Sequence, residues 1–116
     1  MSPERIWTFR VRHIFDAIEK ILRYTSGMTI DQFRADERTI DAVIRNFLIV
    51  GEACRHVPSS ARETHPEIPW RLMEGMRHVL VHDYNTVKLD VIWDTIGTDL
   101  PPLLPLLRKM LENNQR

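Results

Sequence analysis

The chain has 116 residues, 43% of them hydrophobic, which predicts a single domain over residues 1–116 with a small core. Sixteen basic and sixteen acidic residues give zero formal net charge, which argues against a broad phosphate-binding surface and leaves room for a small basic site. One cysteine excludes an intrachain disulfide, the charged start predicts no signal peptide, and no apolar run approaches the ~18 residues of a membrane span, so we expect a cytoplasmic protein away from membranes.

The first predicted helix runs from about Pro3 to Thr25, with Ser2 as its cap. Its apolar residues recur at alternating spacings of four and three, which predicts one buried stripe of Trp7, Val11, Ile14, Ile18 and Ile21. Gly27 can end this helix. The segment 29–32, Thr-Ile-Asp-Gln, has the capping-box form that starts a short helical turn.

A second long helix is predicted from about Asp36 to His56. Its stripe consists of Ile40, Val43, Phe47, Val50, Cys54 and Val57. Three apolar residues off that stripe, Ile44, Leu48 and Ile49, predict that the helix meets more than one neighbour. Because the connection to the first helix is short, the two should pack antiparallel.

The rest of the chain is also predicted to be helical. Ser59–Thr64 forms a turn, Pro69 starts a third long helix, and Asn85-Thr86 interrupts the pattern. A fourth helix is predicted to contain Leu89, Ile92, Trp93 and Ile96 and to end at Gly97. A last helix follows Asp99, with Pro105 in or just past its first turn and with Leu103, Leu107 and Met110 facing inward. No segment indicates a strand, so the predicted class is an all-α bundle of four to five helices.

The third helix carries the segment 77–84, Arg-His-Val-Leu-Val-His-Asp-Tyr. A core segment would not hold five such polar groups, because burying each without a partner costs about 1–3 kcal/mol. A solvated face would contain more lysine and glutamate. Arginine can hold phosphate oxygens and histidine can transfer protons near neutral pH, so the segment indicates acid–base chemistry on a phosphate.

The spacing within this segment raises a geometric problem. Arg77 and His82 are five residues apart and point about 140° away from each other on a straight helix. Either the helix loosens near His82, or a second copy of the chain completes the site. His78 and His82 are spaced as metal ligands can be, but no third ligand is evident beyond Asp83 or Glu74, and we expect no metal and no cofactor.

The pattern R-x4-H-x-Y, from Arg77 through His82 to Tyr84, resembles the signature of the HEPN superfamily and of its HepT-like toxin branch. Segments that also resemble this family, in its order, are ADERTIDAVIRNFLIVGEACRHVP, IPWRLMEGMRHVLVHDYNTV and LDVIWDTIGTDLPPLL. The resemblance implies a HEPN-type bundle that works as a homodimer with the two motifs facing each other. It further implies a metal-independent endoribonuclease that leaves a 2′,3′-cyclic phosphate, with Arg77 and His82 catalytic and His78 orienting the phosphate.

The resemblance assigns a further role to Tyr84. HepT-like toxins pair with a nucleotidyltransferase antitoxin that transfers AMP to the tyrosine of this motif, in a type VII-like toxin–antitoxin system. Tyr84 is therefore the expected AMP acceptor, whereas its ordinary interpretation is a tyrosine at a helix end with a solvated hydroxyl. Asp83 stands where many relatives have glycine, and it could orient an imidazole, repel RNA phosphate or face water.

Two other interpretations remain open. The chain could be a non-catalytic HEPN interaction module that binds a nucleotidyltransferase partner or a nucleotide, which its neutral charge slightly favours, or a purely structural helical bundle. Outside the motif, ordinary structural roles are expected for His13, His56, His65, Trp70, Met73, Met76 and Trp93.

Overall fold

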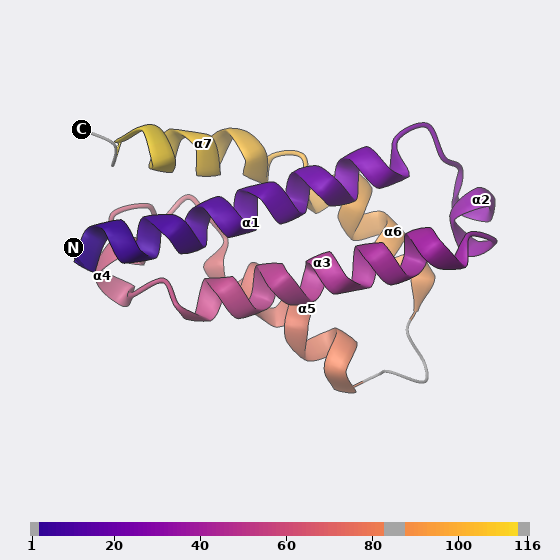
Figure 1. Ribbon diagram of the computed structural model, residues 1–116, viewed down its shortest axis with the longest axis horizontal. Coiled ribbons are helices and arrows are strands. Elements are labelled where there is room, and N and C mark those ends of the chain that lie inside the picture. Colours follow the sequence, from indigo (N-terminus) through magenta and orange to yellow (C-terminus); the bar gives the residue numbers. More distant parts are fainter. Residues whose placement is uncertain (1–2, 83–87, 114–116) are drawn as a thin grey trace.

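The computed structural model describes residues 3–82 and 88–113, with side chains in 7–77 and 88–113. Within these ranges the fold consists of helices and contains no strand, which confirms the predicted all-α class (Figure 1). The helices are α1 (Pro3–Thr25), α2 (Ile30–Arg34), α3 (Glu37–Arg55), α4 (Ser59–Glu63), α5 (Trp70–His82), α6 (Leu89–Asp94), the π-helical segment η1 (Thr95–Asp99) and α7 (Leu103–Asn113).

The long helices α1 and α3 form the antiparallel pair that the short connection predicts (Figure 1). Their apolar stripes make the centre of the core, where the fully buried side chains include Val11, Ile14, Ile18, Ile21, Val43, Val50 and Cys54. Burying one such aliphatic side chain stabilises the fold by about 1.5–3 kcal/mol. The burial of these stripes therefore stabilises the packing of α1 against α3.

The turn between α1 and α3 is set by local sequence. Gly27 adopts a φ of +78°, a left-handed conformation that suits glycine after a helix end. The predicted capping box is present, because the Thr29 hydroxyl accepts from the Gln32 N–H at 3.1 Å and the Gln32 side chain accepts from the Thr29 N–H at 2.9 Å. Asp36 then caps α3 by accepting from the Thr39 N–H at 3.1 Å.

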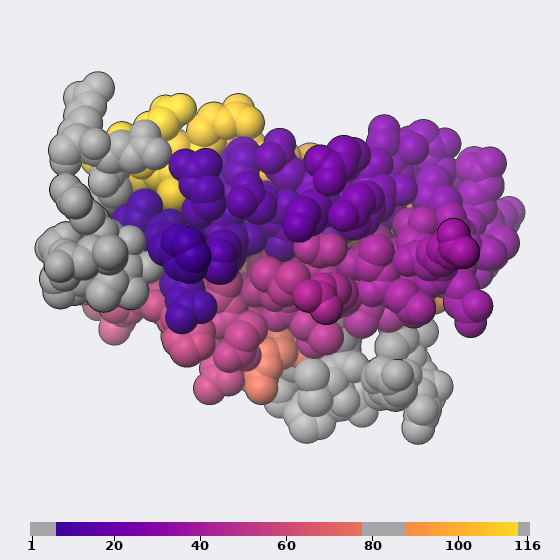
Figure 2. Space-filling view, viewed as in Figure 1, coloured from indigo at the N-terminus to yellow at the C-terminus, as the bar shows by residue number. Residues whose placement is uncertain are grey.

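Helix α3 lies between α1 and α5, while α7 covers the other side of α1 (Figure 1). The off-stripe residues Ile44, Leu48 and Ile49 are half-buried against the core, as expected for a helix with two neighbours. In the space-filling view, side chains of α1 and α3 form most of one broad face (Figure 2). Among the described helices, none is long and apolar enough to cross a membrane.

The predicted end of the fourth helix at Gly97 is wrong. The chain continues past it in η1, where the Leu100 N–H donates to the Thr95 carbonyl at 3.0 Å. This hydrogen bond joins residues five positions apart, as in a π-helix, and therefore widens the turn. Ile96 and Leu100 are both buried in the core. In α7, Pro105 lies in the first turn and the three predicted core residues are buried, as expected. The predicted break at Asn85-Thr86 lies outside the described residues.

Candidate functional site

Arg77 packs tightly against α3 at Gly51. A Cβ added at Gly51 would lie 2.4 Å from the Arg77 Cβ and 2.8 Å from its backbone nitrogen. Any larger residue at 51 would therefore collide with backbone as well as side chain. Gly51 thus fixes how closely the start of the R-x4-H-x-Y motif packs on α3.

Arg62 holds the neighbouring part of α5 in place. Its guanidinium donates to the carbonyls of Val57 at 3.1 Å and Cys54 at 2.5 Å, and contacts Glu74 of α5 at 3.1 Å. These contacts satisfy carbonyl groups at the C-terminal end of α3 and tie it to α5. Arg62 is largely buried and fully engaged, so it acts as a structural arginine.

Glu52, the residue after Gly51, gathers three basic side chains from two helices. Its Oε2 lies 3.2 Å from Arg77 Nε and 3.6 Å from Arg55 Nη1, and its Oε1 lies 3.4 Å from His56 Nε2. We call these four residues the Glu52 cluster. Arg77 is 41% exposed and Glu52 is 51% exposed, so solvent and a ligand can reach both side chains.

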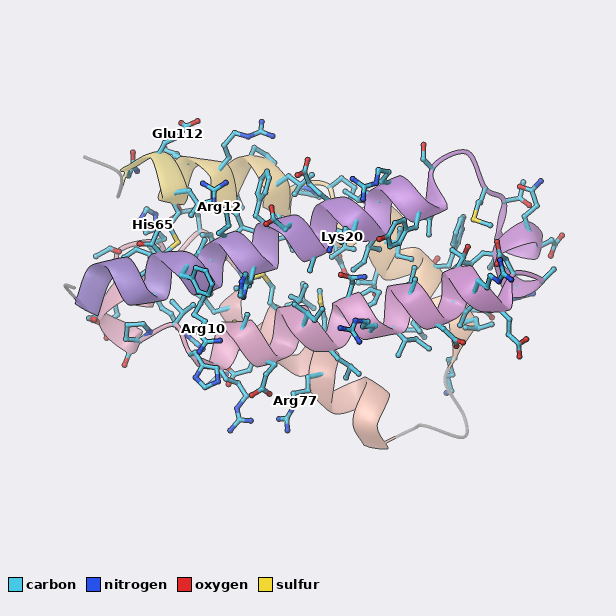
Figure 3. The ribbon with its side chains drawn as sticks, in the orientation of Figure 1. Arg10, Arg12, Lys20, His65, Arg77 and Glu112 are labelled. Atoms are coloured by element: carbon cyan, nitrogen blue, oxygen red, sulfur yellow. The ribbon has the colours of Figure 1, made fainter. Side chains whose placement is uncertain are left out.

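The Glu52–Arg77 contact orients the guanidinium more than it stabilises the fold, because an exposed ion pair contributes only about 0–1 kcal/mol. Glu52 engages Nε of Arg77. The two terminal nitrogens carry the other four N–H groups in the planar fork that suits a phosphate. In Figure 3 the Arg77 side chain points outward at the edge of the α3–α5 pair.

Helix α5 is unbroken from Trp70 through His82, which bears on the first of the two geometric alternatives raised by the sequence. The helix does not loosen before His82, so positions 77 and 82 lie about 140° apart around its axis. One copy of the chain therefore does not bring these two positions onto one stripe. The side chains of His78 and His82, and all of Asp83 and Tyr84, lie outside the described structure.

An apolar hollow of about 270 Å³ lies between α3, α5 and α6, on a side of α5 that does not include Arg77. Leu72 of α5 and Val91 of α6 line it and are 43% and 52% exposed, so together they place apolar surface at the mouth of the hollow. Gly75 also lines it, and position 82 follows Gly75 by seven residues, which places both on one face of α5. Arg77 thus faces the end of α3, whereas position 82 continues the face that borders the hollow.

The other histidines with described side chains differ in their surroundings. The His13 ring contacts the Phe9 ring in a tilted arrangement with centroids 4.3 Å apart, and His65 is buried with Nδ1 3.4 Å from Glu67. Both fit the ordinary roles expected. His56 joins the Glu52 cluster beside Arg77, which the sequence interpretation missed. Its spacing of four from Glu52 predicted that these two share a face of α3, but not that Arg77 reaches them.

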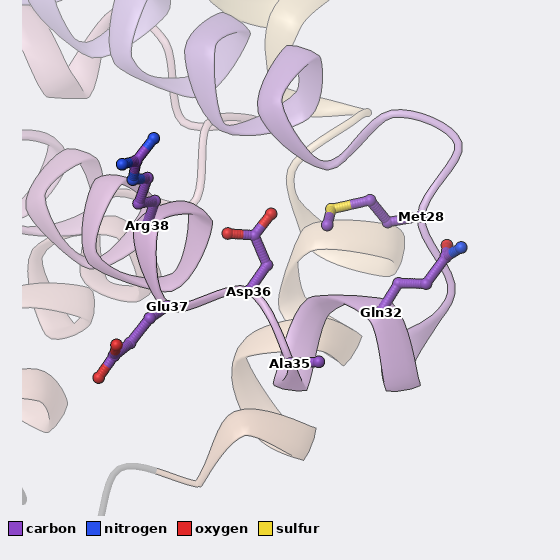
Figure 4. Close-up of a pocket in the computed structure, with 6 residues that line it drawn as sticks. All are labelled: Met28, Gln32, Ala35, Asp36, Glu37 and Arg38. Carbon is purple, nitrogen blue, oxygen red and sulfur yellow. The ribbon is translucent and has the colours of Figure 1, made fainter.

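Two further features do not form the site. One is the shallow hollow beside the α2–α3 turn, whose lining includes Asp36 (Figure 4). The Asp36 carboxylate caps α3, and its hydrogen bonds from Thr39 lower its pKa below the usual value. Burial raises the pKa of the Cys54 thiol to about 11, so it stays protonated at neutral pH and is a poor nucleophile. Among the described side chains, no three His, Cys, Asp or Glu residues are grouped as metal ligands.

An all-α bundle that presents the arginine of an R-x4-H-x-Y motif on an exposed helix edge is of the HEPN-type ribonuclease class. The profile of the family described as Ribonuclease HepT-like matches residues 14–110, and the chain belongs to this family.

Individual relatives agree with this assignment. The chain is 40% identical to a probable ribonuclease HepT of Thermococcus cleftensis over 84% of this chain and 88% of that protein. It is 30% identical to a putative RNase of Caldanaerobacter subterraneus over 90% of this chain and 94% of that protein. It also matches, at 36% identity, 46% of a longer Methanocaldococcus jannaschii protein named as a gamma-glutamylcyclotransferase and putative RNase. No solved structure matches the chain.

Proposed function

We propose that this protein is a metal-independent endoribonuclease in which Arg77 and His82 are the catalytic residues and residues 1–116 form one domain. The observation that carries the proposal is the placement of Arg77. Its guanidinium is exposed, is oriented by Glu52 and stands five residues before His82 on an unbroken helix. Membership of the HepT-like ribonuclease family supports RNA as the substrate.

The proposed reaction uses the RNA 2′-hydroxyl as nucleophile. An imidazole removes the hydroxyl proton, the 2′-oxygen attacks the adjacent phosphorus, and the bond to the 5′-oxygen breaks as that oxygen gains a proton. The products are a 2′,3′-cyclic phosphate and a free 5′-hydroxyl. Arg77 binds the non-bridging oxygens, on which negative charge accumulates in the transition state, and His78 helps to orient the phosphate.

We also propose that two copies of the chain complete the site. In one copy positions 77 and 82 face different sides of α5, and the face that leads to position 82 borders the exposed apolar hollow at Leu72 and Val91. A second copy packed there would cover apolar surface and bring its own arginine and histidine to the first. Each site then combines Arg77 of one copy with His82 of the other.

In the same proposal the enzyme is a toxin whose antitoxin is a nucleotidyltransferase that transfers AMP to Tyr84. The added phosphodiester would lie two residues from His82, where its charge competes with RNA for Arg77 and its bulk blocks access. Tyr84→Phe removes only the acceptor oxygen, so this variant should retain cleavage and escape inhibition. Intact mass spectrometry after incubation with the partner and ATP should show added AMP on the wild type and none on the variant; equal modification of both would reject this acceptor.

The direct test of the enzyme is cleavage of single-stranded RNA in the presence of a chelator. Wild type should cleave and leave a 2′,3′-cyclic end. His82→Ala should be inactive, and Arg77→Ala should lose about 10²–10³-fold in rate, because one such transition-state contact is worth about 3–4 kcal/mol. Full activity of His82→Ala would reject the mechanism.

The second candidate is a HEPN module that binds the nucleotidyltransferase or a nucleotide without cleaving RNA. The zero net charge of the chain favours it, since RNA-binding proteins commonly carry excess positive charge. Partner or nucleotide binding by wild type and by His82→Ala, with no RNA cleavage by either, would support this alternative.

A further inference from the structure

We infer that Arg55 and His56 form a second phosphate-binding subsite, which takes the phosphate next to the scissile one on the same single-stranded RNA. This inference rests on the proposed ribonuclease function and adds to it where the substrate strand runs. It assigns to the end of α3 a role that the R-x4-H-x-Y motif does not include.

The first support is the sharing of one carboxylate. Arg55 and Arg77 both contact Oε2 of Glu52, so their guanidinium groups are neighbours although they come from different helices. His56 occupies the other oxygen, Oε1. In the space-filling view the end of α3 and the visible part of α5 meet at one edge of the molecule (Figure 2). A strand whose phosphate binds Arg77 therefore has Arg55 and His56 within reach of its next phosphate.

The second support is charge. Glu52 supplies one negative charge to two guanidinium groups and one imidazole, so the cluster keeps positive charge in a chain of zero net charge. Arg34 differs, because among the described side chains it forms a one-to-one ion pair with Asp90. Arg55 and His56 are each about half exposed, at 48% and 50%, so neither must be uncovered before it binds a ligand.

A structural explanation exists for part of the cluster. Basic residues at the C-terminal end of a helix interact favourably with its partial negative charge, and this accounts for Arg55 and His56 at the end of α3. It does not account for the arrival of Arg77 from α5 at the same carboxylate. The two explanations also differ in outcome, because a helix-end role affects stability and not RNA binding.

The test uses the full chain with Arg55→Gln and His56→Gln together. Arg12→Gln with His13→Gln is the matched control, since Arg12-His13 is the same dipeptide on α1 and Figure 3 shows Arg12 on the α7 side of α1, away from Arg77. In a His82→Ala background that prevents cleavage, fluorescence anisotropy should show that the Arg55/His56 variant binds a single-stranded oligoribonucleotide about tenfold more weakly. The slope of log Kd against log salt should fall by about 0.7 for each lost contact. The control should bind as the parent does.

Substrate length provides the sharper measurement. A dinucleoside monophosphate has one phosphate, so the Arg55/His56 variant with an intact His82 should cleave it with unchanged kcat/KM. The defect should appear, as a raised KM with unchanged kcat, when a second phosphate is added. A variant that merely displaced Arg77 would lose kcat on both substrates, and that result would overturn the subsite.

The remaining outcomes separate this inference from the proposed function. If wild type cleaves RNA and the Arg55/His56 variant matches the control, the subsite is wrong and the ribonuclease stands. If wild type neither binds nor cleaves RNA, both fail. If the variant loses only its affinity for the nucleotidyltransferase, the end of α3 is a protein-docking surface and the RNA subsite is rejected.

Discussion

At the scale of single residues, a substitution at Glu52 tests the orientation of the Arg77 guanidinium without removing its charge. Glu52→Ala removes the carboxylate 3.2 Å from Arg77 Nε, so the guanidinium is no longer held. We expect kcat for RNA cleavage to fall about tenfold, equivalent to about 1.4 kcal/mol of transition-state stabilisation. RNA affinity should be unchanged or higher, because a negative charge beside the phosphate is lost. Glu52→Gln should recover part of kcat, since its amide oxygen can occupy the place of Oε2 beside Arg77 Nε.

Glu74 offers the matched control for this prediction. It lies on α5, is 41% exposed and pairs with a different arginine, Arg62, at 3.1 Å. Glu74→Ala should lower the thermal midpoint slightly and leave kcat of the folded protein unchanged. Equal losses of kcat in Glu52→Ala and Glu74→Ala would show that Glu52 acts only through stability.

At the scale of elements, the contact between α3 and α5 depends on Gly51. A Cβ at this position collides with the backbone of Arg77 at 2.8 Å, so Gly51→Ala forces the helices apart. We expect the free energy of unfolding to fall by about 1–3 kcal/mol, as for other overpacked sites, and cleavage to fall with it as Arg77 moves. Denaturant unfolding with unchanged m-value measures the first effect.

Gly75 provides the opposite case on the facing helix. A Cβ added there meets no described atom within 4 Å, and alanine favours the helix over glycine by about 1 kcal/mol. Gly75→Ala should therefore be neutral or stabilising. If Gly51→Ala were equally well tolerated, the close approach of α5 to α3 would not be what positions Arg77.

At the scale of the whole molecule, the proposed second copy predicts complementation between inactive variants. Arg77→Ala and His82→Ala each lack one group, but a mixed dimer contains one site with both groups if each site draws them from different copies. Mixing equal amounts should restore up to about a quarter of wild-type cleavage, because half the dimers are mixed and each has one good site. Sites built within one chain would give no recovery.

The same proposal makes a physical prediction about assembly. Light scattering should give the mass of a dimer at micromolar concentration. Leu72→Glu, which places a charge at the exposed apolar hollow, should shift the equilibrium toward monomer without lowering helix content. A monomeric wild type at that concentration would contradict the two-copy site.

The fold followed from the sequence wherever its cause was local. The bounds of α1, the capping box at Thr29, the left-handed Gly27 and the buried stripes of α1 and α3 all depend on residues within a few positions of one another. The prediction at Gly97 was wrong because the wider turn of η1 is favoured by burying Ile96 and Leu100 together, which is a tertiary effect.

The sequence by itself determined the helical class, the core stripes, the position of the R-x4-H-x-Y motif and the resemblance that family membership confirms. Only the tertiary structure decided what surrounds Arg77. Glu52 and Arg77 are far apart in the chain, and periodicity says which face of its own helix each occupies but not which faces meet. The crossing of α3 and α5 at Gly51 brings them together, because a glycine there lets two backbones approach more closely than any side chain would allow.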